Sequence, residues 1–281
     1  MDVSNKPEKL QAEVINPELH SRNIKVAMID FDGTLSLLRE GWDQVMIPMM
    51  VEELLPLQGT SETLDNLTAK VTEWVLKLNG QPTIMQMQAL VDEVALRQGT
   101  PATASQYKVR YLERLLATVN QRKQQILNSR QADAWMVPGS REMLNQLKVR
   151  QIPMLLASGT DLRDLHSESE LLGLVDYFTE GIAGPESDAS SFSKAKACDD
   201  MLSRQKAPGS SLLNIGDGYV ETRLTKDRGG LAIGIAYDHD EPGQYNPWRK
   251  EQLLRAGVDI ILPDLRQSDL LLRWLLDGQT S

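Results

Sequence analysis

The feature that most constrains the fold is a short apolar run that ends in two carboxylates. The run 26–29 is apolar throughout, which is typical of a central strand in a parallel sheet whose two faces are both covered. Asp30 and Asp32 follow it, and Gly33 and Thr34 complete the motif. Since residues i and i+2 of an extended chain project to the same side, both carboxylates enter one small volume at the end of the strand. Two such charges raise each other's pKa unless a cation compensates, so the spacing predicts a metal site.

Composition narrows the class of protein. The 281 residues are 41% hydrophobic and 25% charged, as in ordinary folded proteins, and the formal net charge is −9. This charge disfavours nucleic acid and anionic lipid as partners, whereas a small substrate that arrives with a divalent cation is compatible with it. The single cysteine excludes an internal disulfide. Because no apolar run approaches the ~18 residues that span a bilayer and the N-terminus lacks a secretory signal, we expect a cytoplasmic protein without membrane contact.

The chain alternates short apolar runs with helical patterns, which predicts an α/β fold with a parallel sheet and crossover helices. All predicted strands but the first lie after residue 150. They cover 25–29, 152–157, 177–183, 211–215, 231–236 and 259–262. A leucine-rich stretch at 268–275 predicts a packing helix at the end of the chain.

Between the first and second predicted strands the pattern is helical throughout. Good helix formers and helix-spaced apolar residues predict four helices, at 42–55, 64–78, 84–98 and 106–127. Prolines and glycines separate them. This insertion of roughly 100 residues has the size of a domain, and we expect a helical bundle that sits over the sheet.

Three further segments carry chemistry near a predicted strand end or helix start. Ser158 and Gly159 follow the second strand and open a helix, whose free N–H groups suit a phosphate. Lys194 lies at the start of a later helix and supplies a cation. The strand 211–215 then runs into Gly-Asp-Gly-Tyr-Val-Glu, where Asp217 and Glu221 offer two more carboxylates. Together with the first motif, these segments are far more specific than any one of them alone.

The ordered set resembles the haloacid dehalogenase-like superfamily of phosphotransferases. The stretch 30–34 is similar to the first motif of that superfamily, Ser158 to the second and Lys194 to the third. Asp217 and Glu221 are similar to the fourth motif, in its GDxxxE form. The resemblance implies a hydrolase or another phosphoryl-transfer enzyme and rests on all four motifs in order.

The resemblance also implies a domain organisation. A Rossmann-like three-layer core would comprise residues 25–35 and 136–281, and the helical insertion 36–135 would be a cap domain. The polar residues 1–24, with two prolines, would form a lead-in segment.

The roles that the resemblance implies for catalysis agree with the chemistry of the residues. Asp30 would attack phosphorus and form an aspartyl-phosphate. Asp32 would protonate the leaving oxygen and later deprotonate the attacking water. Ser158, Gly159 and Lys194 would bind the phosphate oxygens.

The resemblance further implies Mg²⁺ as the cofactor. Asp30, the main-chain carbonyl of Asp32 and Asp217 would hold the ion, and Glu221 would hold a water molecule bound to it, although direct ligation by Glu221 stays open. The implied reaction is hydrolysis of a small phosphorylated metabolite, such as a sugar phosphate. A phosphomutase of the same superfamily and a non-catalytic binding domain on this fold remain alternatives.

Sequence alone leaves several assignments open. Lys196 is the alternative to Lys194 as the third-motif lysine, since element boundaries carry an error of about 2 to 4 residues. Arg39 fits either a residue that reaches the substrate or a solvated surface arginine. Cys198 is expected in the core rather than as a nucleophile. Substrate identity and oligomeric state are not predicted.

Overall fold

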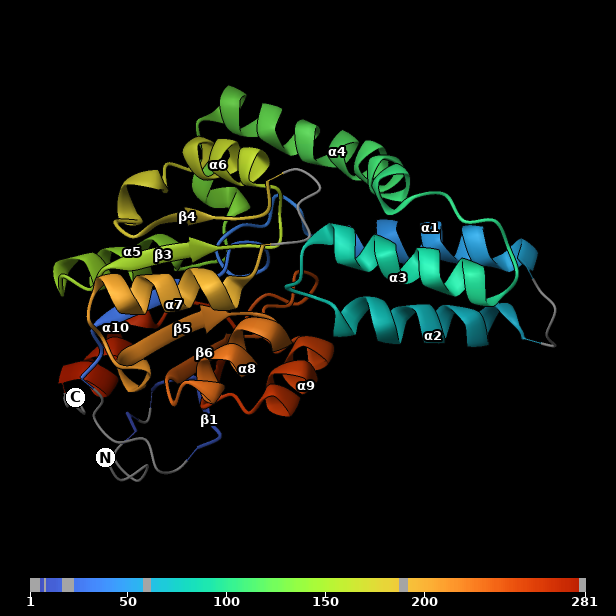
Figure 1. Ribbon diagram of the computed structural model, residues 1–281. Helices are drawn as coiled ribbons and strands as arrows, with labels where there is room; N and C mark the ends of the chain where they lie inside the picture. Colours follow the sequence, from blue (N-terminus) through green and yellow to red (C-terminus); the bar gives the residue numbers. More distant parts are fainter. Residues whose placement is uncertain (1–5, 8, 17–22, 58–61, 187–191, 278–281) are drawn as a thin grey trace.

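The structure is a computed structural model, and it describes residues 6–7, 9–16, 23–57, 62–186 and 192–277. In these residues the strands form one sheet in the order β1-β7-β6-β5-β2-β3-β4 (Figure 1). The strands are β1 (Glu13–Val14), β2 (Val26–Ile29), β3 (Met154–Ala157), β4 (Gly181–Ala183), β5 (Leu212–Gly216), β6 (Leu231–Ile235) and β7 (Ile260–Leu262). All neighbouring pairs are parallel except β1 with β7. The predicted α/β class with a mainly parallel sheet is therefore confirmed.

Strand β2 lies at the centre of the sheet. It pairs with β5 on one side and with β3 on the other, so Met28 stands opposite Asn214 and Leu155. Every residue of β2 is buried, as the apolar run predicts. Because parallel strands end at the same edge, the carboxyl ends of β5, β2 and β3 meet there, and the sequence motifs follow these three strands.

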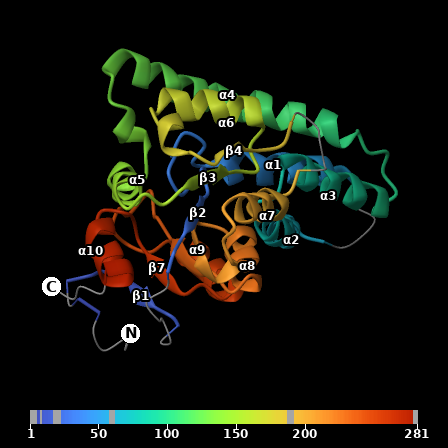
Figure 2. The same ribbon diagram turned by 60° about the vertical axis from the view of Figure 1, so that its left-hand side comes forward.

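Helices cover both faces of the sheet. On one face, α5 (Ser140–Val149), α6 (Leu162–Leu171) and α10 (Ser268–Leu272) pack into the largest apolar cluster, and on the other face α7 (Lys194–Arg204), α8 (Tyr219–Asp227) and α9 (Pro247–Ala256) pack into two smaller ones. Figure 2 shows α5 and α10 on one side of the strands and α7 and α8 on the other. This is the three-layer arrangement that the family resemblance implies. In the described part of the chain, no helix is both long enough and apolar enough to cross a bilayer.

Four helices between β2 and β3 form a second unit, which lies beside the core and whose last helix runs along α6 (Figure 1). They are α1 (Trp42–Leu54), α2 (Leu64–Lys77), α3 (Thr83–Leu96) and α4 (Ala104–Ser129). Each lies within two residues of its predicted bounds, because helix-spaced apolar positions and the capping box at the start of α4 are local signals. The unit has its own buried apolar cluster, to which Met46, Met49 and Met50 contribute.

Two linkers connect this unit to the core, and they run side by side. Leu37 N donates to Trp135 O at 2.9 Å, and Val137 N donates to Leu35 O at 3.0 Å. Arg122 of α4 fastens the first linker by donating to three of its carbonyl oxygens. We propose these linkers as the boundaries of a cap domain at 36–135.

The N-terminal segment is more than the lead-in that the sequence predicts for residues 1–24. Leu10 and Ala12 are buried in the main apolar cluster, and β1 adds an antiparallel edge strand to β7. Sequence analysis missed β1 because a two-residue strand has no apolar periodicity to detect.

Two other elements differ in extent from their predictions. Only Gly181–Ala183 of the predicted strand 177–183 is extended, because the preceding residues form a 3₁₀ turn at Val175–Tyr177. The predicted helix at 268–275 consists of α10 followed by a π-helical turn at Arg273–Asp277. The core assignment of Cys198 is confirmed, since this residue is fully buried and burial raises the pKa of its thiol to about 11.

Candidate active site

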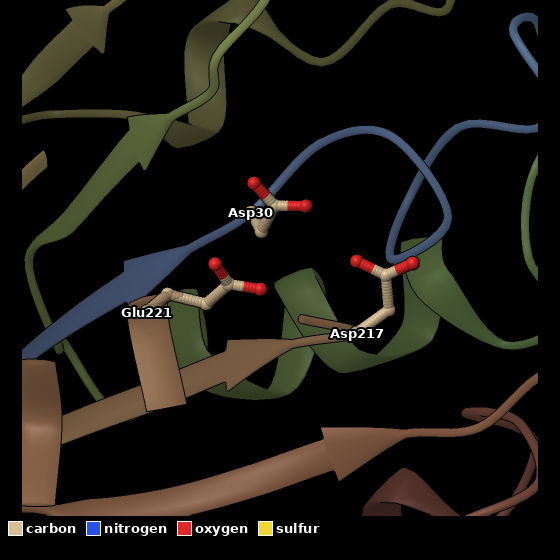
Figure 3. Close-up of side chains that lie close together, drawn as sticks. All are labelled: Asp30, Asp217 and Glu221. Carbon is tan, nitrogen blue, oxygen red and sulfur yellow. The ribbon is translucent and has the colours of Figure 1, made fainter. Parts of the chain in front are cut away.

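Three buried carboxylates meet at the carboxyl ends of β2 and β5. Asp30 follows β2, Asp217 follows β5, and Glu221 lies in the first turn of α8. Figure 3 shows their carboxylates gathered around a common space. One carboxylate oxygen from each of the three residues lies within 4.8 Å of the chosen oxygens of the other two residues. The structure thus brings together residues that are up to 191 positions apart in the sequence.

Lys194 enters this cluster from the start of α7. Its Nζ donates to Asp30 Oδ1 at 2.5 Å and to Glu221 Oε2 at 3.1 Å. The backbone turn is set by Ser193, whose hydroxyl caps α7. Lys194 is 4% exposed, whereas Lys196 is exposed on the outer face of the helix. Of the two lysines that sequence left open, the structure places Lys194 in the cluster.

Burial governs the charge states of the acids. It raises the pKa of Asp30 to about 7, an effect that Lys194 opposes and that repulsion from Glu221 adds to. Burial likewise raises the pKa of Asp217 well above its usual value, with Arg249 opposing and Asp30 adding. Lys194 keeps its proton, because the two carboxylates outweigh the cost of burial and raise its pKa. Burial, more than mutual repulsion, thus makes the charged forms of Asp30 and Asp217 costly, and a bound cation would stabilise them.

This arrangement fits a divalent cation. Mg²⁺ prefers carboxylate and carbonyl oxygens, and Asp30 and Asp217 supply two carboxylates whose pKa values burial raises in spite of Lys194 and Arg249. Glu221 already accepts Gly218 N at 2.6 Å with Oε1 and Lys194 with Oε2, which suits an orienting role as well as ligation. The side chain of Asp32 lies outside this cluster, so only its main-chain carbonyl remains a candidate ligand.

Asp32 instead faces the loop after β3. Its Oδ2 accepts the hydroxyls of Ser158 at 3.1 Å and Thr160 at 2.8 Å. Its Oδ1 is buried and has no hydrogen-bond partner among the described residues. Burial raises the pKa of Asp32, while Arg39 opposes this shift. One oxygen of Asp32 is thus held in place and the other is left for a ligand.

Sequence analysis gave no role to Thr160. The signal was present, because Thr160 stands two positions after Ser158 in the same loop, and its N–H donates to Ser158 Oγ at 3.0 Å. The two hydroxyls therefore act as one clamp on Asp32.

The cap reaches the site through the loop between α2 and α3. A Cβ added to Gly159 would lie 2.4 Å from the carbonyl oxygen of Gln81, and one added to Gly80 would lie 2.8 Å from Glu221 Oε2. The cap loop thus approaches the core backbone at Gly159 and the carboxylate of Glu221. The remaining chamber is lined by Asp30 and Asp32 from the core and by the cap loop, and its volume is about 60 Å³.

Replacement of Gly159 tests this contact. We expect Gly159→Ala to lower kcat/KM by about 10- to 100-fold with little change in Tm, because the added methyl group holds the cap loop away from the site. Steady-state kinetics and thermal melting measure both effects. Gly99→Ala is the control, since its Cβ meets only side chains within the cap. Equal rates for wild type and Gly159→Ala would show that closure at this contact does not matter.

Two arginines belong to the site as well. Arg39 is buried and lines the chamber, so it is not a solvated surface residue. Arg249 of α9 places Nε 3.5 Å from Asp217 Oδ2 and donates from Nη2 to both oxygens of Glu40 in the first linker. Sequence analysis missed Arg249 because no motif marks it and the fold alone brings α9 to the site.

Comparison with known proteins agrees with this geometry. The model of the haloacid dehalogenase-like hydrolases matches residues 24–222. The chain therefore belongs to the haloacid dehalogenase-like hydrolase family, as the resemblance in sequence implies. None of the curated proteins matches the chain.

Solved structures share the fold at low sequence identity. A β-phosphoglucomutase from Clostridium difficile is 14% identical over 87% of this chain and 92% of its own, with a TM-score of 0.55. A predicted phosphoglycolate phosphatase from Haemophilus somnus is 14% identical over 88% and 97%, with a TM-score of 0.53. A family member from Deinococcus radiodurans with bound phosphate and sodium is 14% identical over 90% and 97%, with a TM-score of 0.53. These matches identify the fold, and they include both phosphatases and phosphomutases.

Proposed function

We propose that this hydrolase is a Mg²⁺-dependent phosphatase that removes phosphate from a small metabolite through an aspartyl-phosphate on Asp30. The observation that carries the proposal is the pairing of Asp30 with Lys194 at 2.5 Å beside two further carboxylates at one sheet edge. Such a site supplies a nucleophile, a cation for the phosphate and oxygen ligands for a metal.

Asp30 is suited to act as the nucleophile. Its Oδ1 is held by Lys194, and Thr34 Oγ1 lies 3.4 Å from its Oδ2, so the carboxylate is fixed before substrate arrives. Attack on phosphorus by one of its oxygens forms the acyl phosphate and breaks the ester bond.

Asp32 is suited to act as the general acid and base. The clamp by Ser158 and Thr160 fixes one oxygen, and the unpartnered Oδ1 is available to the leaving oxygen. The raised pKa keeps a proton on this carboxyl more readily than on an exposed aspartate. After the alcohol leaves, the same group removes a proton from the water that hydrolyses the acyl phosphate.

The remaining residues of the site would bind the phosphate group and the metal ion. Ser158, the main-chain N–H of Gly159 and Lys194 would bind the phosphate oxygens, which is supported by the place of Ser158 and Gly159 in the chamber lining and of Lys194 beside Asp30. Asp30, Asp217 and the carbonyl of Asp32 would hold Mg²⁺, with Glu221 orienting its surroundings. When bound, the ion neutralises the acids and the phosphate so that they can approach each other.

Hydrolysis of p-nitrophenyl phosphate with and without Mg²⁺ tests the proposal. We expect turnover with Mg²⁺ and a loss of at least about 100-fold after treatment with EDTA, restored by adding Mg²⁺ back. Turnover that does not respond to EDTA would contradict the metal dependence.

The two alternatives give different outcomes. A phosphomutase of this family would return phosphate from a sugar bisphosphate to a sugar hydroxyl, so phosphate would stay esterified instead of appearing free in solution. A binding domain would release no phosphate from any ester above the background of Asp30→Asn.

A further inference from the structure

Arg39 holds one side of its guanidinium against the core. Nε donates to Glu168 Oε2 at 3.0 Å, and Nη2 donates to Glu168 Oε1 at 2.8 Å and to Asp164 Oδ2 at 3.0 Å. Nη1 has no hydrogen-bond partner in the described part of the chain. The fork–fork contact with Glu168 fixes the plane of the group, so the direction in which Nη1 donates is also fixed.

The charge of Arg39 is already balanced. Glu168 is fully buried and also pairs with Lys123 Nζ at 2.9 Å, and Asp164 adds a second carboxylate to Arg39. The network thus holds two cations and two anions. An additional anion is not needed to neutralise Arg39, and the carboxylate of Asp32, which lines the same chamber, would repel it.

Arg39 is also near the general acid. Arg39 and Asp32 both line the chamber, and the positive charge of Arg39 stabilises the carboxylate of Asp32. Arg39 is the one cation among the described lining residues. The other side chains that the cap contributes to the lining are neutral and either polar or aromatic, namely Trp42, Asn79, Gln81, Thr83, Gln86 and Tyr111.

From this geometry we propose that Arg39 Nη1 donates to a hydroxyl or carbonyl oxygen of the leaving group, so that the enzyme selects phosphate esters of small, uncharged polyhydroxy compounds. The proposal rests on the proposed phosphatase function and adds the substrate class to it. A neutral oxygen acceptor satisfies the free N–H groups of Arg39 without adding negative charge. Oxygens along the same carbon chain would meet the polar lining contributed by the cap.

The volume of the chamber also limits the size of the leaving group. With the cap loop in contact with Gly159, a chamber of about 60 Å³ holds only a few water-sized groups. We therefore expect short leaving groups, such as those of three carbons, to be preferred over longer ones.

The test compares three esters with leaving groups of equal length. The leaving group of n-propyl phosphate carries no further oxygen. That of glycerol 1-phosphate carries two hydroxyls, and that of the phosphate ester of 3-hydroxypropanoate carries a carboxylate. We expect kcat/KM for glycerol 1-phosphate to exceed that of each other ester by about tenfold or more. In Arg39→Lys, which keeps the charge but loses the fixed fork, the preference for glycerol 1-phosphate over n-propyl phosphate should fall to about twofold or less.

A second variant and a control show whether a lost preference results from the missing donor or from misfolding. Arg39→Met combined with Glu168→Gln removes the donor together with the buried carboxylate that it pairs with, and it should lose the same preference. Arg141→Lys lies outside the chamber lining and should retain the wild-type preference. Thermal melting establishes that each variant is folded.

A binding experiment separates this proposal from the phosphatase proposal. Calorimetric titration of the three esters into the Asp30→Asn protein with Mg²⁺ present measures affinity without turnover. A preference for glycerol 1-phosphate that Arg39→Lys abolishes supports the role of Arg39 even if no ester is hydrolysed. Equal affinity for all three esters, stronger binding of the carboxylate ester, or a preference that survives Arg39→Lys would overturn it.

Discussion

Asp30→Asn should lower kcat for p-nitrophenyl phosphate by at least about 1,000-fold, because an amide oxygen is too weak a nucleophile to form the acyl phosphate. The substitution keeps the shape of the side chain, and Glu221 remains as a partner for Lys194. The loss should therefore appear in the rate rather than in folding. Steady-state kinetics and a thermal melt of the same preparation measure the two effects separately.

The matched control for this substitution is Asp133→Asn. Asp133 is an exposed aspartate that pairs with Arg141 at a distance from the carboxylate cluster. We expect kcat of the Asp133→Asn variant to stay within about twofold of the wild-type value, because most surface substitutions have small effects. If Asp30→Asn retained a rate within tenfold of the wild type, Asp30 would not be the nucleophile.

Gly33→Ala should weaken Mg²⁺ binding by about 10- to 100-fold. Gly33 has φ +77°, a left-handed conformation, and a Cβ there would lie 2.2 Å from Asp217 Oδ2. The added methyl group must displace the carboxylate, and displacement of a ligand or its support has this order of effect on metal affinity. Calorimetric titration of Mg²⁺ measures the affinity, and a thermal melt measures the strain.

Gly229→Ala separates strain from displacement. Gly229 has φ +73°, yet a Cβ at this position meets nothing within 4 Å. Gly229→Ala should lower the free energy of unfolding by about 1 to 2 kcal/mol and Gly33→Ala by at least as much, but only Gly33→Ala should change Mg²⁺ affinity. Equal affinities in Gly33→Ala and wild type would show that Asp217 does not bind the ion.

The residues of the site that directly follow a strand could be predicted from the sequence. Asp30, Ser158 and Asp217 each come after an apolar run, and parallel strands bring their carboxyl ends together, so a local pattern located residues that are distant in sequence. The cap helices were predictable for the same reason, because helical periodicity and capping are local.

The contacts made across the fold were not predictable. Arg249 reaches Asp217 only because α9 packs beside α8, and no residue near Arg249 in sequence signals this. The place of Arg39 depends on Glu168 of α6, which is 129 positions away. The loop contact between Gln81 and Gly159 likewise depends on how the cap rests on the core. Each of these interactions is set by tertiary packing rather than by local propensity.

A crystal structure of the protein with Mg²⁺ and beryllium fluoride tests the central claim most directly, since beryllium fluoride mimics a phosphoryl group on a carboxylate. The account predicts beryllium bonded to an oxygen of Asp30, with Lys194 against its fluorides and Mg²⁺ held by Asp30 and Asp217. An empty carboxylate cluster, or a fluoride complex bound away from Asp30, would contradict it.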